Sequence, residues 1–269
     1  MQGIFFDLDG TLLNECHQLN PRTVNAIAAV RQMGIKVCLA SGRTYHSMRP
    51  FYEQLELDTP LACYNGAKIV FASDEIQEQG LPAFVIKELI QISREEQVHL
   101  NLYNDEIWFT ERPESLEAKQ YAEKTHMVPQ GGSLDHLSKL NCTKALFIAS
   151  PDRLTQLAPL VRARLGEYID LTSAMSQFLE VLQKGVNKAW AIKQIAERLN
   201  IDLKQCLAFG DGLNDLEMIQ AVAHGVAMQN AHSTLKQYAQ AIAGHHAEDG
   251  VADYLQSYFG LKSPLIEVD

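Results

Sequence analysis

Short apolar runs alternate with amphipathic segments along the first third of the chain, and this alternation limits the fold more than any other feature. Residues 4–6, 35–40 and 61–64 are short continuous apolar runs of the kind that form buried strands. Amphipathic stretches at 20–33 and 44–55 separate these runs and have the spacing of helices. Strand–helix repetition is typical of a parallel sheet covered on both faces. We therefore expect an α/β fold built on a doubly wound, Rossmann-like parallel sheet.

The last third of the chain repeats this pattern, whereas the middle departs from it. In the last third, the helix-like residues 187–200 precede a strand-like run at 206–209. Between about residues 82 and 182, paired strand-like runs stand together with helices between the pairs, which is typical of an α+β module. We predict a core domain made of residues 1–81 and 183–269, with residues 82–182 inserted as a second domain.

Two carboxylates directly follow the first predicted strand. Asp7 and Asp9 stand on either side of Leu8, and Gly10 then breaks the strand. In open α/β sheets, ligands bind at the carboxyl ends of the strands. Two neighbouring acids repel each other and need a cation or a proton nearby, and Mg²⁺ prefers one or two carboxylates together with phosphate oxygens. A solvated turn is the alternative, because Asp and Gly are common turn residues.

Polar residues at the ends of later segments give three further signals, each of them modest alone. Ser41 ends the second strand, and its hydroxyl can donate to a phosphate oxygen, although Ser-Gly is also a common turn. Lys188 lies in the first turn of a helix, where the helix dipole does not favour a cation. Its rival Lys184, just before the helix, is expected at the surface. The loop Gly210–Asp215 offers two acids and an amide, which suit a hard cation or, alternatively, a helix cap.

The charge balance and the cysteines limit the partners and the location of the protein. The chain has 23 Lys and Arg against 33 Asp and Glu, a formal net charge of −10, which argues against nucleic acid and anionic membranes. Five widely spaced cysteines without a C-x-x-C pair indicate reduced thiols and a cytoplasmic location. Asp7 comes too early for a signal peptide, and no uncharged apolar stretch is long enough to span a membrane. The sequence leaves the oligomeric state open and is compatible with a monomer.

Taken in order, the polar motifs resemble those of the haloacid dehalogenase superfamily of phosphatases. DLDGT at residues 7–11, Ser41, Lys188 and GDGLND at residues 210–215 match its four motifs, and the resemblance covers the whole chain. The NGA sequence at residues 65–67 and the insertion after the third strand resemble the Cof-like subgroup, which carries its cap domain at that point. The resemblance implies that the inserted α+β domain is a cap in which substrate specificity lies.

The resemblance also implies roles for individual residues. Asp7 is the nucleophile that forms an aspartyl-phosphate, and Asp9 is the general acid and base. Mg²⁺ binds Asp7, Asp9 and Asp211, with Asp9 contributing its main-chain carbonyl. Ser41 and Lys188 hold the phosphoryl oxygens as negative charge builds. The other residues expected to bind the phosphate are Leu8, Gly10, Gly42, Arg43 and Asn214.

Two residues are expected to support these groups, and three are candidates for contact with the rest of the substrate. Thr11 orders the first loop, and Asp215 orients the metal's waters or Lys188. The candidates near the mouth of the cleft are Arg43, Asn65 and Glu180, with a surface cation, a turn former and a solvated strand end as the respective alternatives.

The function that these features favour is a Mg²⁺-dependent phosphomonoester hydrolase acting on small phosphorylated metabolites such as sugar phosphates. Two alternatives stay open. A phosphomutase or phosphotransferase on the same scaffold would use a hydroxyl in place of water, and a non-catalytic sensor would only bind the phosphorylated ligand.

Overall fold

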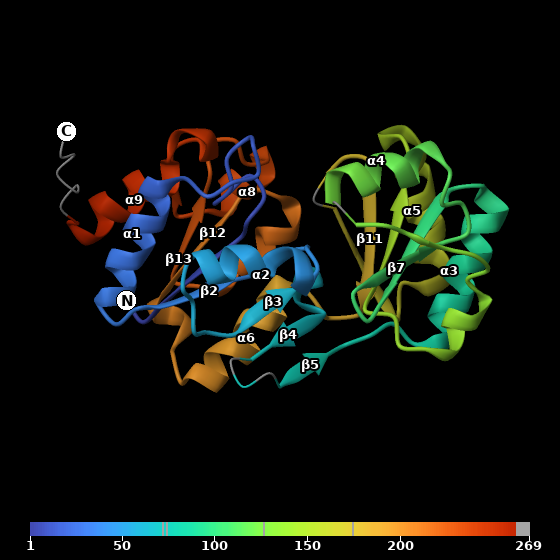
Figure 1. The fold of residues 1–269 in the computed structure, drawn as a ribbon, viewed down its shortest axis with the longest axis horizontal. Coiled ribbons are helices and arrows are strands. Elements are labelled where there is room, and N and C mark those ends of the chain that lie inside the picture. Colours follow the sequence, from blue (N-terminus) through green and yellow to red (C-terminus); the bar gives the residue numbers. More distant parts are fainter. Residues whose placement is uncertain (72, 74, 126, 174, 262–269) are drawn as a thin grey trace. The chain divides into compact units, whose positions relative to one another are not determined.

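The computed structural model describes residues 1–261 apart from 72, 74, 126 and 174, and it divides the chain into two compact units (Figure 1). The first unit combines Met1–Ser41, Arg49–Leu61 and the chain from Ile192 onward. The second unit combines Gly42–Met48 with Ala62–Ala191. The division into domains at residues 82 and 182 stays a prediction.

A five-stranded parallel sheet forms the centre of the first unit. In spatial order its strands are β14 (Ala241–Ile242), β13 (His224–Ala227), β12 (Cys206–Gly210), β1 (Gly3–Phe6) and β2 (Lys36–Leu39). All neighbouring pairs in this sheet are parallel. Every residue of β1 and β12 is buried, which explains why these strands are continuous apolar runs without alternation. The expected parallel sheet is thereby confirmed.

Helices surround this sheet, and the C-terminal helix is fastened to the first one. The helices are α1 (Pro21–Gln32), α2 (Tyr45–Gln54), α6 (Lys188–Leu199), α7 (Leu216–Ala221), α8 (Ser233–Tyr238) and α9 (Gly250–Phe259). Helices α1 and α9 pack side by side (Figure 1), with Arg22 donating to Asp253 and Thr23 Oγ1 donating to Asp249 at 3.1 Å. No helix in the described part of the chain has the length and apolar character needed to cross a membrane.

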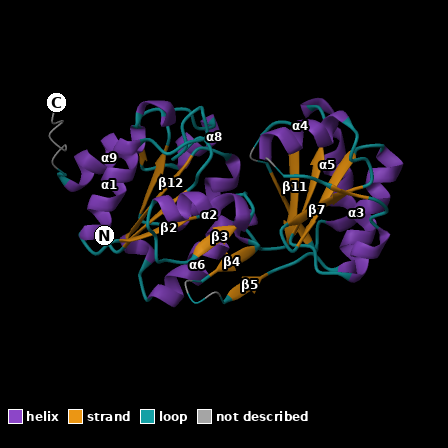
Figure 2. Ribbon diagram, in the orientation of Figure 1, coloured by secondary structure: helices purple, strands orange, loops and turns teal. Residues whose placement is uncertain are grey.

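A six-stranded, mostly antiparallel sheet forms the centre of the second unit (Figure 2). In spatial order its strands are β10 (Ile169–Thr172), β11 (Phe178–Gln183), β9 (Lys144–Ile148), β6 (His99–Asn104), β7 (Ile107–Thr110) and β8 (Gln130–Gly131). Only the pair β7–β8 is parallel among these neighbours. The helices of this unit are α3 (Ala83–Glu96), α4 (Leu116–Thr125) and α5 (Pro151–Leu165). The expectation of an α+β module in the middle of the chain is confirmed.

The third predicted strand forms, but it pairs elsewhere than expected. Strand β3 (Leu61–Cys63) lies in a small sheet with β4 (Lys68–Val70) and β5 (Ile76–Glu78), rather than extending the five-stranded sheet. The chain turns sharply between β3 and β4, where Tyr64 and Asn65 take positive φ angles of 52° and 54°. Strands β4 and β5 are too short to stand out as patterns in the sequence.

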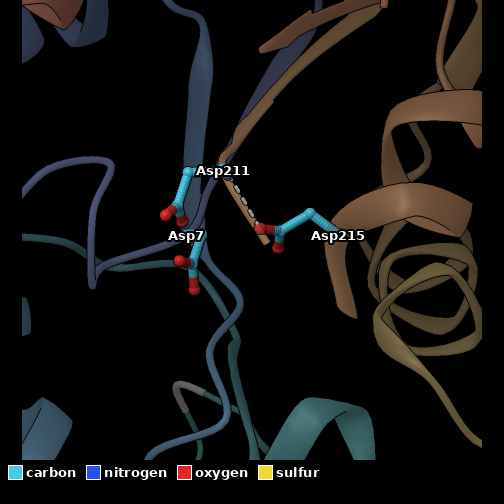
Figure 3. A group of neighbouring side chains, drawn as sticks. All are labelled: Asp7, Asp211 and Asp215. Carbon is cyan, nitrogen blue, oxygen red and sulfur yellow. Dashed lines mark hydrogen bonds between the residues drawn. The ribbon is translucent and has the colours of Figure 1, made fainter. Parts of the chain in front are cut away.

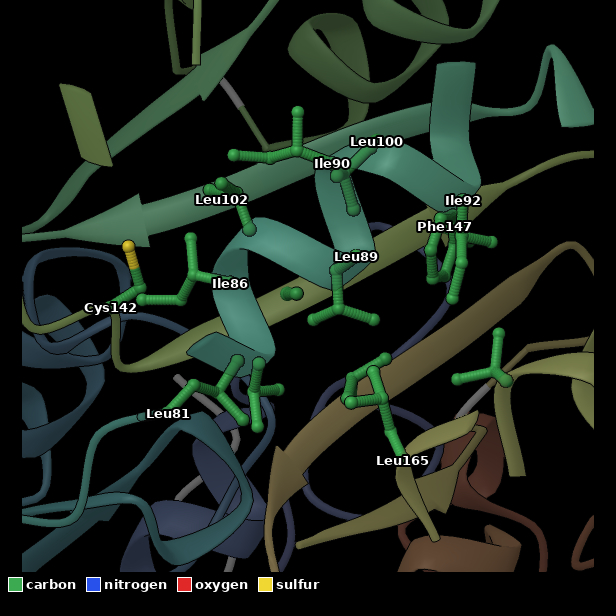
Figure 4. Close-up of a cluster of buried hydrophobic side chains, with 14 of the residues drawn as sticks. Leu81, Ile86, Leu89, Ile90, Ile92, Leu100, Leu102, Cys142, Phe147 and Leu165 are labelled. Carbon is green, nitrogen blue, oxygen red and sulfur yellow. The ribbon is translucent and has the colours of Figure 1, made fainter. Parts of the chain in front are cut away.

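The two faces of the six-stranded sheet differ in chemistry. On one face, side chains from α3, α5 and the strands form a closely packed apolar cluster that includes Leu89, Phe147 and Leu165 (Figure 4). Successive residues of a strand point to opposite faces, so Lys144 lies on the other face from Ala145 and Phe147. The apolar cluster therefore stabilises the second unit, while the other face carries buried polar and charged groups.

The thiols follow the prediction for a chain without a disulfide framework. All five cysteines are free, and four of them are buried while Cys16 is exposed. Burial raises the pKa of Cys38 and of Cys142 to about 12, so both thiols stay protonated at neutral pH.

Truncating a leucine of the apolar cluster should destabilise the protein far more than truncating an exposed one. Leu89 is 0% exposed and Leu116 is 67% exposed. We expect Leu89→Ala to lower the free energy of unfolding by about 2–5 kcal/mol, because it leaves a cavity. The matched control Leu116→Ala should change it by about 0.5 kcal/mol or less. Urea unfolding followed by circular dichroism measures both, and equal losses would contradict the assignment of the cluster.

Candidate active site

Three aspartates converge at the carboxyl edge of the parallel sheet. Asp7 directly follows β1 and Asp211 directly follows β12, and these neighbouring strands are in register with Phe6 opposite Phe209. Asp215 belongs to the short 3₁₀ turn that follows. Each of the three offers a carboxylate oxygen, and these oxygens lie within 4.8 Å of one another (Figure 3). Asp7 and Asp215 are buried, so their mutual repulsion is weakly screened by solvent.

Asp215 is held in place by the backbone of its own loop. Its Oδ2 accepts hydrogen bonds from the N–H groups of Asp211 and Gly212, both at 2.9 Å, and Figure 3 marks the bond to Asp211. Two backbone donors offset part of the negative charge of this buried carboxylate. One oxygen of Asp215 is thus engaged in shaping the loop that presents Asp211.

The side chain of Asp211 packs against a glycine that admits no side chain. Gly10 has a φ of +73°, and a Cβ built on it would lie 2.2 Å from Asp211 Oδ2. The carboxylate therefore occupies the space that any other residue at position 10 would fill. The close approach of the two loops depends on this glycine.

Asn230 joins these loops, although no motif in the sequence pointed to it. Its Nδ2 donates to the carbonyl of Gly10 at 2.8 Å and lies 3.5 Å from Asp211 Oδ2. The signal that could have found it is its place shortly after β13, at the same end of the sheet. Asn230 therefore helps to position the carboxylate of Asp211.

The first loop is a compact turn built by the backbone. The carbonyl of Leu8 accepts hydrogen bonds from the N–H of Thr11 and from the next two N–H groups. Thr11 is buried, and its Oγ1 has no hydrogen-bond partner among the described residues, so its backbone rather than its hydroxyl holds the loop. Asp9 is partly exposed, with its Oδ1 3.5 Å from Nδ1 of His17.

Ser41 and Asn214 lie in the same unit as the three aspartates. The N–H of Ala40 donates to the carbonyl of Phe6 at 2.8 Å, so the end of β2 lies beside the end of β1. Ser41, the next residue, is buried there. Asn214 is also buried, in the turn between Gly212 and Asp215. The carboxyl ends of three neighbouring strands thus present a hydroxyl and an amide together with the acids.

The remaining predicted residues belong to the second unit. Lys188 is the first residue of α6 and is fully buried. Asn65 and Glu180 are also buried, and Asn65 Nδ2 donates to Glu180 Oε2 at 2.6 Å. Gly42 and Arg43 are partly exposed. The site roles predicted for these five residues stay predictions.

Lys184, the alternative to Lys188, lies at the surface as expected. The side chain of Lys184 is 55% exposed, and its Nζ forms an ion pair with Asp170 Oδ1 at 2.6 Å.

The donor set at the edge of the parallel sheet fits a hard divalent cation. Carboxylate oxygens are the ligands that such cations prefer, and the three aspartates bring one oxygen each into the same small volume. A cation there would relieve the repulsion among the carboxylates.

The chain is similar in sequence and in fold to known proteins. The family model described as haloacid dehalogenase-like hydrolase matches residues 4–255. The chain is 32% identical over 265 residues to the 5-amino-6-(5-phospho-D-ribitylamino)uracil phosphatase YitU of Bacillus subtilis (strain 168), covering 96% of this chain and 97% of that protein. It is 31% identical to the HMP-PP phosphatase of Serratia proteamaculans (strain 568), covering 97% and 96%. A solved structure of a haloacid dehalogenase-like hydrolase from Bacteroides thetaiotaomicron is similar with a TM-score of 0.85 at 29% identity, covering 96% and 99%.

A methyl group at position 10 should cost more than the same change at another glycine with similar backbone angles. Gly34 has a φ of +80°, and no atom lies within 4 Å of the place that a methyl group would take there, whereas at Gly10 the methyl group meets Asp211. We expect Gly34→Ala to lower the free energy of unfolding by about 1–2 kcal/mol through backbone strain alone. Gly10→Ala should cost about 1–3 kcal/mol more, because it also displaces the Asp211 side chain. Chemical unfolding of both variants measures the difference, and equal losses would show that Asp211 moves aside at no cost.

Proposed function

The chain belongs to the haloacid dehalogenase-like hydrolases of the Cof type and is a phosphatase, and from this premise we propose that it hydrolyses phosphomonoesters of small metabolites with Mg²⁺ through an aspartyl-phosphate. The observation that carries the proposal is the convergence of carboxylate oxygens of Asp7, Asp211 and Asp215 within 4.8 Å at the ligand-binding edge of the sheet.

Asp7 is proposed to act as the nucleophile. It is buried at the end of β1, and its N–H donates to the carbonyl of Phe209 at 3.0 Å, so its backbone is fixed in the sheet. In the first step, a carboxylate oxygen of Asp7 forms a bond to phosphorus as the bond between phosphorus and the leaving oxygen breaks. In the second step, water attacks the aspartyl-phosphate, which releases inorganic phosphate and regenerates the carboxylate.

Asp9 is proposed to move the protons. Its side chain is partly exposed, unlike that of Asp7, so it can exchange protons with the solvent between the steps. It first gives a proton to the leaving alkoxide and then takes one from the attacking water. The compact turn at Leu8 holds the backbone between the proposed nucleophile, Asp7, and the proposed acid, Asp9.

The carboxylates of Asp7 and Asp211 and the main-chain carbonyl of Asp9 are the groups that would hold Mg²⁺. When bound, the cation supplies the positive charge that lets one anion approach another. Asp215 keeps Asp211 in place through its two backbone hydrogen bonds. Asn230 supports the same side chain from the opposite loop.

Ser41 and Lys188 are proposed to hold the phosphoryl oxygens. A buried hydroxyl and a buried ammonium are strong donors to an anion, because little water competes for them. The other residues proposed for this role are Leu8, Gly10, Gly42, Arg43 and Asn214. Thr11 is proposed to support the loop that carries Leu8 and Gly10.

The proposed substrate is a small phosphorylated metabolite. Two similar proteins carry the names 5-amino-6-(5-phospho-D-ribitylamino)uracil phosphatase and HMP-PP phosphatase, which favours a metabolite substrate for this chain as well. Release of inorganic phosphate from a panel of sugar phosphates, nucleotides and vitamin-related phosphates, with Mg²⁺ and with EDTA, tests the proposal. Release that needs Mg²⁺ supports it. Transfer to an added hydroxyl acceptor without phosphate release would favour a phosphotransferase, and binding without any turnover would favour a sensor.

Replacing the proposed nucleophile should abolish turnover without unfolding the protein. In Asp7→Asn the side chain keeps its size, but the carboxylate oxygen that attacks phosphorus is replaced by a neutral amide, which is a much weaker nucleophile. We expect kcat to fall by about a thousandfold or more, with an unchanged circular dichroism spectrum. Steady-state phosphate release by the purified variant measures this. Retained hydrolysis would contradict the assignment of Asp7.

Replacing a proposed metal ligand should change the dependence on Mg²⁺. We expect Asp211→Asn to raise the Mg²⁺ concentration for half-maximal activity by about 10- to 100-fold, since one charged ligand is lost. Asp58→Asn is the matched control, because Asp58 is an exposed aspartate of the same unit outside the cluster. Titration of activity with Mg²⁺ gives both values. An unshifted curve for Asp211→Asn would remove this residue from the proposed ligands.

A further inference from the structure

The segment Gly42–Met48 belongs to the second unit, although only Ala40 and Ser41 separate it from β2. It starts immediately after Ser41 and leads into the first turn of α2. Groups of the second unit bind this segment at three points, at Gly42, Arg43 and His46. We call these three contacts anchors. In two of them, the second unit contributes a charged side chain whose burial or position is otherwise hard to explain.

The first anchor is a buried lysine. Lys144 Nζ donates to the carbonyl of Gly42 at 3.0 Å and to Glu180 Oε2 at 3.1 Å, and the side chain is only 4% exposed. The ammonium also lies over the rings of Tyr64 and Tyr103, 5.7 and 5.1 Å from their centroids. A buried ammonium needs such partners because it has lost its hydration. The carbonyl of Gly42 is one of them.

Glu180 orients this lysine. Its carboxylate is as deeply buried as the lysine, and its Oε2 also accepts a hydrogen bond from Asn65 Nδ2 at 2.6 Å. Two donors thus hold the same oxygen from two directions. Glu180 lies in β11, which pairs with the strand that carries Lys144, and its carboxylate holds the same ammonium that donates to Gly42.

The second anchor is Glu106, in the tight turn between β6 and β7. Its Oε1 accepts from Lys68 Nζ at 2.7 Å, and its Oε2 accepts from the N–H of His46 at 3.1 Å. His46 lies in the first turn of α2, where a negative charge is favourable. The third anchor is a backbone bond, from the N–H of Tyr64 to the carbonyl of Arg43 at 2.9 Å.

These anchors set the direction of the peptide group that follows Gly42. In a trans peptide, the carbonyl of one residue and the N–H of the next point in opposite directions. A donor that holds the carbonyl of Gly42 therefore also fixes the direction in which the N–H of Arg43 points. Backbone N–H groups in such a loop, leading into a helix, are typical groups for binding an anion.

We propose that Lys144 and Glu106 are positioning residues that fix the segment Gly42–Met48 and thereby shape the backbone that binds the phosphoryl group. The inference rests on the proposed function, because it assigns phosphate binding to Ser41, Gly42 and Arg43. It goes beyond that function, because it assigns two charged side chains of the second unit an effect on the affinity for the phosphoryl group. This effect should be the same for substrates that differ in the rest of the molecule.

The test uses the full-length protein and the variants Lys144→Met and Lys144→Met/Glu180→Gln. The readouts are amide hydrogen exchange of residues 42–48, the inhibition constant of inorganic phosphate, and kcat/KM for several substrates with different leaving groups. We expect Lys144→Met to speed exchange in the segment. It should also weaken inhibition by phosphate and lower kcat/KM by a common factor of about 10- to 100-fold for all substrates.

The double variant separates positioning from simple charge compensation. It removes both buried charges, and the new glutamine keeps an oxygen that can accept from Asn65, so stability should recover. The carbonyl of Gly42 still lacks its donor, so phosphate inhibition should stay weak and exchange fast. If phosphate inhibition returns to the wild-type value in the double variant, Lys144 serves only to neutralise Glu180, and the inference is wrong.

Arg153→Met is the matched control. It removes an ion pair of the same unit, between Arg153 and Glu96 at 2.6 Å, that does not involve the segment. Exchange in residues 42–48 and the kinetic constants should be unchanged in this variant. If the decrease in kcat/KM caused by Lys144→Met varies strongly with the leaving group, Lys144 contacts the substrate, and the positioning role is wrong.

The same experiment distinguishes the inference from the proposed function. If the wild-type protein releases no phosphate from any substrate, the proposed function fails. Hydrogen exchange then still decides whether Lys144 holds the segment, because that readout does not depend on activity. Unchanged exchange in a folded Lys144→Met variant would overturn the inference even if the protein is an active phosphatase.

Discussion

Crowding of negative charge at one edge of the parallel sheet is the constraint to which the rest of the site responds. Carboxylates of Asp7, Asp211 and Asp215 share a small volume, and two of them are buried. Left alone, such a cluster would be unfavourable, because like charges repel and buried charges lose hydration. Two backbone N–H groups that donate to Asp215 offset part of this unfavourable energy, and Gly10 leaves space for the side chain of Asp211. A bound cation would reduce the repulsion among these carboxylates further.

The architecture could be predicted because its signals are local. The strands of the parallel sheet are buried on both faces, so each is a continuous apolar run, and the residue after each run lies at the ligand-binding edge. This reasoning placed Asp7 and Asp211 at the same edge, where the structure has them. Helix α1 (Pro21–Gln32) lies within the stretch 20–33 that is predicted to be helical.

Contacts between distant residues account for what the sequence could not reveal. Asn230 reaches Gly10 across 220 positions, and no spacing rule connects them. Lys144 and Glu180 lie in strands where a charged residue predicts solvent exposure, yet both are buried because each compensates the other. Glu180 is a sequence-based candidate for the mouth of the cleft, and its carboxylate accepts hydrogen bonds from Lys144 and Asn65. Strand β3 likewise pairs with short strands whose pattern is too weak to detect.

The central pairing of the parallel sheet has a consequence for how the chain is made. Strand β1 lies between β2 and β12, and its residue Gly3 pairs with Cys206. During synthesis on the ribosome, β1 can therefore pair with β12 only after most of the chain has been made. The second unit is nearly continuous from Ala62 to Ala191 and is complete earlier. Domains generally fold as units during synthesis, and non-local pairing is slow. Strand β1 can pair with β2 early, but it stays without its second partner, β12, until residues 206–210 have been made.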